Sequence, residues 1–185
     1  MDKGGECYRR FLAGDEAGLV DLVSLYYDGL VMFLMQIVGI PDVAEDLAED
    51  TFLRLCVKQP NYKNEATFKT WLYTIARNLA TDYLRKNKRF ITLTDSVISE
   101  RVEIKDSVSE SFFKNEISVA LRKAMCSIKP EYAQVLFLTY FENLSNKETA
   151  KILKKSVHAV ENLNYRARIA LKAELEKEGF TDEQI

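Results

Sequence analysis

Apolar side chains recur at spacings of three and four residues through most of this 185-residue chain, and this periodicity constrains the fold more than any other feature. One run, from Leu19 to Ile37, predicts a helix with one buried face, capped by Asp15 and ended by Gly39 and Pro41. The chain has only three prolines and seven glycines, and good helix formers such as Leu, Ala, Lys and Glu dominate it. We therefore expect an all-α protein.

Further helices follow along the chain. Asp42, with Glu45 three residues later, resembles a capping box at the start of a second helix, whose inner stripe includes Leu47, Thr51, Phe52 and Leu55. Residues 59–67 are predicted to form a loop, after which a long helix runs from 68 to 89.

The chain divides into two predicted domains. Residues 90–111 are rich in serine and acidic side chains and have no sustained period, which is typical of a flexible linker. Helical periodicity returns at residue 112 and continues almost to the end. We predict two small helical domains, residues 1–89 and 112–185, joined by that linker.

Charge is unevenly distributed although the net charge is only −2 and the pI is near 5.6. Residues 69–89 contain six basic and one acidic side chain, and residues 144–172 contain seven basic and two acidic ones. Residues 42–50 contain five acidic and no basic side chains. The distribution of charge, rather than its sum, is therefore the feature that bears on nucleic-acid binding.

Several other functions are disfavoured by composition. The three cysteines are odd in number and widely spaced, which suits a reduced cytosolic protein, and the single histidine cannot support a histidine-based metal cluster. We expect no metal or cofactor, and find no phosphate-binding glycine loop or nucleophile–base set typical of an enzyme. The N-terminus lacks a signal-peptide pattern, and the apolar stretch 29–40 is too short to span a bilayer, so we expect a cytoplasmic protein without membrane insertion.

The C-terminal part has the plan of a helix-turn-helix. Ser145 and Glu148 form a capping box for a short helix, and Ser156 caps the next helix, which would bury Val157 and Val160. The opposite face carries polar and basic side chains: His158, Glu161, Asn162, Tyr165, Arg166, Arg168 and Lys172. Such a face can contact base edges and phosphates in a major groove. A helical hairpin with a solvated face remains an alternative at this point.

The helix from 68 to 89 has two faces. The core stripe is predicted to be Phe68, Leu72, Ile75, Leu79 and Tyr83. A second line at helical spacing comprises Trp71, Asn78, Asp82, Arg85 and Arg89. Aromatic rings beside cations suit single-stranded nucleic acid, where bases stack and phosphates pair. Core packing of Trp71 and Tyr73 under a charged exterior remains the alternative.

Three motifs, in this order and spacing, resemble bacterial RNA polymerase sigma factors of the extracytoplasmic-function (ECF) group. They are "DVAEDLAEDTFLRL" at 42–55, "FKTWLYTIARNLATDYLRKNKR" at 68–89, and "LSNKETAKIL" followed by "SVHAVENLNYRAR" at 144–168. The resemblance covers roughly residues 19–89 and 117–175. It implies a promoter-specificity subunit that binds core RNA polymerase, recognises promoter DNA and helps to open it.

The resemblance also implies roles for individual residues. The acidic helix of region 2 would dock on the clamp helices of the polymerase largest subunit, and region 4 would lie near the polymerase flap. The implied polymerase contacts are Asp42, Glu45, Asp46, Glu49, Asp50, Phe52 and Arg54. A solvated acidic face is the alternative.

In the same family the loop and helix that follow read and melt the minus-ten promoter element. The implied residues are Tyr62, Lys63, Asn64, Ala66, Thr67, Trp71, Asn78, Asp82, Arg85, Lys86, Lys88 and Arg89. Region 4 binds the minus-thirty-five element, which assigns Ser156, His158, Glu161, Asn162, Tyr165, Arg166 and Arg168. Lys154 and Lys155 depart from the family at the turn, where a left-handed Lys154 would carry modest strain.

Regulation and an alternative follow from the same resemblance. Such sigma factors are held inactive by an anti-sigma factor, often tethered to a membrane, and their linker threads near the RNA exit channel. The linker here has more acidic than basic residues, which is compatible either with nucleic-acid mimicry or with a soluble tether. The competing function is a conventional helix-turn-helix transcription regulator that acts as a dimer.

Overall fold

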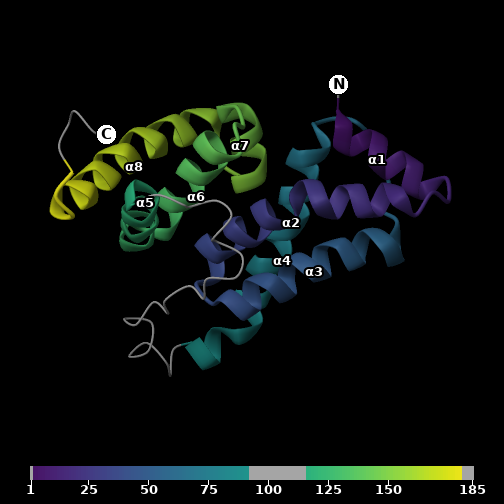
Figure 1. The fold of residues 1–185 in the computed structure, drawn as a ribbon, viewed down its shortest axis with the longest axis horizontal. Helices are drawn as coiled ribbons and strands as arrows, with labels where there is room; N and C mark the ends of the chain where they lie inside the picture. Colours follow the sequence, from purple (N-terminus) through teal and green to yellow (C-terminus); the bar gives the residue numbers. More distant parts are fainter. Residues whose placement is uncertain (1, 92–115, 181–185) are drawn as a thin grey trace.

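The computed structural model describes the backbone of residues 2–91 and 116–180, and these residues form an all-α protein (Figure 1). The N-terminal helices are α1 (Lys3–Leu12), α2 (Ala17–Val38), α3 (Pro41–Lys58) and α4 (Phe68–Ile91). The C-terminal helices are α5 (Glu116–Ser127), α6 (Pro130–Leu136), the π-helical turn η1 (Phe137–Phe141), α7 (Asn146–Leu153) and α8 (Val157–Lys177). The all-α prediction is confirmed. Most of the predicted linker, from residue 92 onward, lies outside the described residues.

Helix α2 is the centre of the N-terminal domain, where it packs against α1, α3 and α4. Its end was predicted correctly, since Gly39 adopts φ 72° and its N–H donates to the Met35 carbonyl over 3.0 Å. By length and composition α2 is long and apolar enough to cross a membrane. The apolar stretch 29–40, judged too short to span a bilayer, is only part of this helix. The packing of α2 on three helices is that of a core helix.

The start of α3 corrects one prediction. Helix α3 begins at Pro41, Ile40 is the N-cap, and no side chain forms a capping hydrogen bond. The predicted capping box of Asp42 and Glu45 is therefore wrong. Pro41 has its φ fixed near the helical value and needs no N–H partner at the first helical position, so the helix begins before Asp42.

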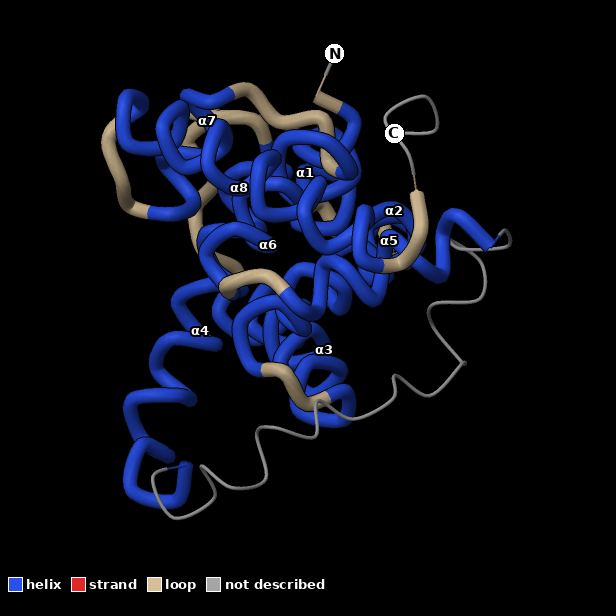
Figure 2. The backbone as a smooth tube through the Cα atoms, turned by 90° about the vertical axis from the view of Figure 1, so that its left-hand side faces the viewer, coloured by secondary structure: helices blue, strands red, loops and turns tan. Residues whose placement is uncertain are grey.

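Helix α1 was not anticipated from the sequence. It packs against α2 and α4, and its Cys7 and Tyr8 side chains are buried. The C-terminal end of α4, in contrast, projects beyond the rest of the N-terminal domain (Figure 2).

In the C-terminal domain, α8 packs against α5, α6 and α7. The capping box of Ser145 and Glu148 and the cap at Ser156 are both present, as predicted. Val157, predicted to be buried, is 40% exposed, because it occupies the first position of α8, where the helix has only begun to pack on its neighbours. Burial in α8 begins instead at Val160.

The two domains pack side by side (Figure 1). Helix α7 lies against α4, and α6 lies against α2. Phe33 of α2 and Phe137 of η1 stack with ring centroids 6.4 Å apart, so one apolar cluster extends through both domains.

Candidate nucleic-acid and protein interfaces

The acidic side chains predicted on α3 form an exposed face. Asp42, Asp46, Glu49 and Asp50 lie along it, and Glu45 is half-buried. These carboxylates also affect the pKa of the neighbouring Tyr27. The pKa of Tyr27 is raised by burial first and then by carboxylates that include Glu49 and Glu45.

Two apolar side chains extend this face and were missed in the sequence. Leu53 is 57% exposed and Val57 is 73% exposed. With Asp46 and Asp50 they follow spacings of four, three and four, which places all four on one side of α3. Adjacent exposed apolar side chains rimmed by charges are compatible with a protein-binding surface, and this spacing was the signal that could have found them.

The predicted polymerase contacts Phe52 and Arg54 lie differently. Phe52 is 6% exposed and packs on Tyr27, with ring centroids 6.4 Å apart. In this structure its ring therefore supports α3 from inside the core. Arg54 is half-buried.

The loop from 59 to 67 presents some predicted side chains and buries others. Lys63, Asn64 and Thr67 are exposed, and Asn64 has a left-handed backbone with φ 57°. Tyr62 and Ala66 are half-buried, and the Tyr62 hydroxyl oxygen lies 2.6 Å from the Ala66 carbonyl oxygen.

Trp71 belongs to an aromatic cluster at the start of α4. Its ring centroid lies 5.2 Å from that of Tyr62, 5.4 Å from Phe68 and 5.5 Å from Tyr8. Trp71 is half-buried. It therefore fits in part the interpretation as a base-stacking ring and in part the interpretation as a core ring. Tyr73 is fully buried, in agreement with the core alternative.

Further along α4 the predicted DNA-facing residues lie on the projecting part of the helix. Asp82 and Lys86 are exposed, and Asn78 is half-buried. Arg85 pairs with Asp82 over 3.1 Å, and its side chain is 75% exposed. The side chains of Lys88 and Arg89 lie outside the described part of the chain.

Helices α7 and α8 form the predicted helix-turn-helix. The turn between them is made possible by Lys154, which adopts φ 53° and ψ 44° and ends α7. The Ser156 hydroxyl then accepts from the Ala159 N–H over 3.1 Å and starts α8.

The outer face of α8 is largely exposed, as predicted. The predicted DNA-facing residues on it are Ser156, His158, Glu161, Asn162, Tyr165, Arg166 and Arg168. His158 and Asn162 lie 3.1 Å apart through their side-chain nitrogens, one turn from each other. Arg166 and Arg168 have no acidic partner among the described residues, which leaves their guanidinium groups available to phosphates or base edges.

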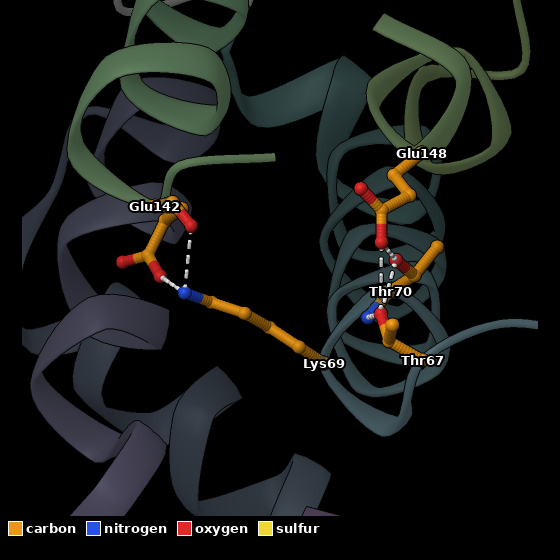
Figure 3. Close-up of polar contacts among 5 residues, drawn as sticks. All are labelled: Thr67, Lys69, Thr70, Glu142 and Glu148. Carbon is orange, nitrogen blue, oxygen red and sulfur yellow. Dashed lines mark hydrogen bonds and ion pairs between the residues drawn. The ribbon is translucent and has the colours of Figure 1, made fainter. Parts of the chain in front are cut away.

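A polar contact joins the predicted minus-ten segment to the helix-turn-helix (Figure 3). Glu148 of α7 accepts from the Thr67 hydroxyl over 3.1 Å and from the Thr70 hydroxyl over 3.4 Å. Lys69 donates to the Glu142 backbone carbonyl over 2.9 Å and also pairs with the Glu142 carboxylate.

Glu148 has two functions at this contact. Its other carboxylate oxygen accepts from the Ser145 N–H over 3.0 Å and so completes the capping box of α7. Burial alone raises the pKa of Glu148, but hydrogen bonds from Ser145, Thr67 and Thr70 outweigh burial and hold this pKa below its ordinary value. No sequence pattern pointed to this contact.

No group of three or more potential metal ligands occurs among the described residues, so nothing in that part of the chain suggests a metal centre.

Comparison with known proteins agrees with this arrangement. Residues 22–90 match the family model for Sigma-70 region 2, and residues 118–171 match that for Sigma-70, region 4. The chain is 30% identical over 163 residues to the ECF RNA polymerase sigma factor SigM of Bacillus subtilis, covering 88% of this chain and 98% of that protein. It is 28% identical over 174 residues to SigW of the same organism, covering 88% and 91%.

Solved structures share the fold. The sigma factor RpoE of Bartonella quintana, solved in complex with the anti-sigma factor NepR, superposes with a TM-score of 0.69 at 25% identity, covering 83% of this chain and 94% of that one. CnrH, solved with the cytosolic domain of CnrY, gives a TM-score of 0.64 at 20% identity, covering 95% and 97%.

An acidic helix, an aromatic and basic helix and a helix-turn-helix, in the order of Sigma-70 regions 2 and 4, define a transcription initiation factor. The chain belongs to the ECF sigma factors of bacterial RNA polymerase. It is a promoter-specificity subunit of that enzyme.

Proposed function

We propose that three separate surfaces divide the work of this sigma factor. The exposed face of α3 docks on the clamp helices of the polymerase largest subunit. The loop 59–67 and α4 read and open the minus-ten element, and the outer face of α8 binds the minus-thirty-five element, with region 4 beside the flap.

The observation that carries this proposal is the placement of charge on exposed helix faces. Carboxylates dominate the exposed face of α3, whereas the end of α4 and the outer face of α8 expose arginine and lysine. Nucleic-acid affinity derives largely from cations that neutralise phosphates, so DNA would be attracted to α4 and α8 and repelled from α3. Leu53 and Val57 add apolar area to α3, as a protein interface requires.

In this proposal promoter opening requires no catalytic step by a side chain of the protein. Binding energy alone offsets the unstacking of a flipped base, which costs a few kcal/mol. In this proposal the chain is not an enzyme, takes no cofactor and acts in the cytoplasm with the polymerase.

Simultaneous reading of both promoter elements requires the domains to part. The element names place them roughly 25 base pairs apart, or about 85 Å along B-DNA. A compact chain of 185 residues has a radius of gyration of about 16 Å, too small to span that distance. In the structure Thr67 is engaged by Glu148 of the other domain. The contact in Figure 3 must therefore break before one molecule can engage both promoter elements.

An anti-sigma partner is part of the proposal. The RpoE relative was solved in complex with the anti-sigma factor NepR, which supports a partner of the same class here. Such a partner, free or tethered to a membrane, would control access to the polymerase and DNA surfaces.

The test is gel filtration of this protein mixed with sigma-free core polymerase, beside its Leu53→Glu variant. Co-elution of the wild type at about one per core, with weaker co-elution of the variant, supports the docking surface. Separate elution of the wild type, together with a dimeric mass and affinity for a palindromic duplex, would support a conventional dimeric regulator instead. Run-off transcription of genomic fragments by the reconstituted holoenzyme then identifies a promoter.

A further inference from the structure

We propose that α1, acting through the Asp2 carboxylate, is a positioning element that holds the minus-ten segment in its reading conformation. The inference rests on the proposed function, because it concerns the loop 59–67 and the start of α4. It adds a part of the chain that lies before residue 22, where the match to Sigma-70 region 2 begins.

The first observation is that Asp2 is the N-cap of α1 and also accepts an N–H at the start of α4, beside the local cap Thr67. One carboxylate oxygen accepts from the Gly5 N–H over 3.3 Å and starts α1. The other accepts from the Phe68 N–H over 2.9 Å, a donor in the first turn of α4. Because the first N–H groups of a helix have no partner within it, Asp2 fixes the origin of α4 from 66 residues away.

The same carboxylate holds the loop itself. The Tyr62 hydroxyl donates to Asp2 and also contacts the Ala66 carbonyl, so one phenol joins Asp2 to the middle and the end of the predicted reading loop. Burial first, and then the hydrogen bond to Asp2, raise the pKa of Tyr62 above its ordinary value. The phenol therefore remains a hydrogen-bond donor throughout the physiological range.

The second observation is independent of hydrogen bonding and concerns glycine. A Cβ on Gly4 would meet the Tyr26 hydroxyl and would lie 2.6 Å from a Phe68 ring carbon. A Cβ on Gly5 would lie 2.8 Å from Asp2 and 2.9 Å from the Tyr62 ring. A Cβ on Gly18 would lie 2.5 Å from the Cys7 carbonyl, on the other side of α1. Three glycines thus let α1 approach α2, α4 and the loop more closely than any other residue would allow.

The aromatic cluster completes the support. Tyr8 of α1 is fully buried, donates to the Pro60 carbonyl over 2.9 Å and packs against Phe68 and Trp71. Helix α1 therefore contacts the beginning of the loop through Tyr8, its middle through Tyr62, and the start of α4 through Phe68. A segment fixed at these points presents Lys63, Asn64 and Thr67 in one arrangement, which lowers the ordering cost of binding DNA.

The experiment compares Asp2→Ala and Asp2→Asn with the wild type and with Glu6→Ala. Glu6→Ala is the matched control, since it removes an exposed carboxylate from the same helix without touching the loop. Each variant is assembled with core polymerase, and opening at a promoter found with the wild-type holoenzyme is measured by permanganate reactivity of minus-ten thymines. Trp71 is the only tryptophan, so acrylamide quenching of its fluorescence reports on the segment directly.

We expect Asp2→Ala to reduce promoter opening about fivefold, the effect of losing one helix cap. Quenching of Trp71 should rise, while core binding and duplex affinity at the minus-thirty-five element stay at the wild-type level. Asp2→Asn should recover most of the activity, because asparagine also caps helices. Circular dichroism at the assay temperature confirms that each variant is folded. If Asp2→Ala does not fold, Asp2→Asn and Tyr62→Phe, which removes the donor to Asp2, provide the same comparison.

Equal opening and equal quenching for Asp2→Ala and Glu6→Ala would overturn the inference. Reduced opening with unchanged quenching would overturn it as well, since Asp2 would then act without moving the segment. If the wild type neither binds core polymerase nor opens DNA, the proposed function fails. The quenching comparison needs no DNA and still reports whether Asp2 holds the loop.

Discussion

The contact between Lys69 and Glu142 gives the most direct test of how the two domains are held together. The side chains of Lys69 and Glu142 are 28% and 13% exposed, so the pair is intermediate between a surface ion pair and a buried one. Exposed pairs contribute about 0.2–1 kcal/mol, and breaking a buried pair costs about 3–5 kcal/mol. We therefore expect Glu142→Gln to weaken domain docking by about 1–2 kcal/mol, or roughly 5- to 30-fold.

The surroundings of Glu142 make this variant informative. Its carboxylate lies beside the buried phenol of Tyr73, whose pKa is raised well above its ordinary value by burial first and then by Glu142. A glutamine side chain in its place would keep the volume and one acceptor oxygen, while the negative charge is lost and the second oxygen is replaced by an amide donor. The matched control is Glu174→Gln, since Glu174 pairs with Lys177 over 2.7 Å within α8 alone.

The assay is a double-mutant cycle of Lys69→Met and Glu142→Gln, followed by urea unfolding. Fluorescence of Trp71 reports on the N-terminal domain, where the sole tryptophan lies. The coupling free energy should be about 1–2 kcal/mol at low salt and should fall with added salt. Small-angle scattering should give a radius of gyration of about 16 Å for the wild type. It should give a larger value for a Glu142→Gln, Glu148→Gln double variant. A coupling below about 0.5 kcal/mol, with Glu142→Gln no different from Glu174→Gln, would refute the reasoning.

Four further predictions concern single positions. Leu53→Glu should weaken core-polymerase binding about 5- to 30-fold without changing the melting temperature, because this side chain is exposed; gel filtration and thermal melting check both. Arg166→Ala should lower affinity for minus-thirty-five duplex and reduce the slope of log affinity against log salt by about 0.9, measured by fluorescence anisotropy. The pKa of Glu148 is lower in the docked state than the ordinary value of 4.5. The stabilisation of the docked state by ionised Glu148 is therefore complete above about pH 4.5 and is lost as pH falls through the lowered pKa. Small-angle scattering across this pH range should show an increase in the radius of gyration of the wild type that Glu148→Gln no longer shows. Lys154→Gly should raise the free energy of unfolding by about 0.5–1 kcal/mol in urea, because φ 53° is strained for lysine.

The parts of the fold that could be predicted depend on neighbouring residues. Gly39, Ser145 and Ser156 were predicted as caps and are caps, because a cap depends on a few adjacent backbone groups. Periodicity likewise predicted the buried stripe of α3. The capping box at Asp42 failed at the same local level, because Pro41 was an equally good start for the helix.

The parts that could not be predicted depend on contacts distant in sequence. Helix α1 is short, and its docking requires Gly4 and Gly18 to meet partners that no local pattern reveals. Glu148 was predicted as a cap, but its contact with Thr67 joins residues 81 positions apart. The sequence could not decide whether Trp71 stacks on bases or packs in the core, because its exposure depends on Tyr8, a residue of the unpredicted helix.

The docked arrangement restricts the two proposed DNA-binding surfaces unequally. In the same structure the outer face of α8 is exposed, with Arg166 and Arg168 lacking an acidic partner among the described residues, whereas Thr67 and Thr70 are engaged by Glu148. Docking therefore leaves duplex recognition by α8 sterically open and occupies part of the segment proposed to open DNA. If core polymerase binds the exposed face of α3, as proposed, it leaves the Glu148 contact untouched. Parting of the domains then requires a competing contact on α4 or α7, and promoter DNA at the minus-ten segment supplies one directly.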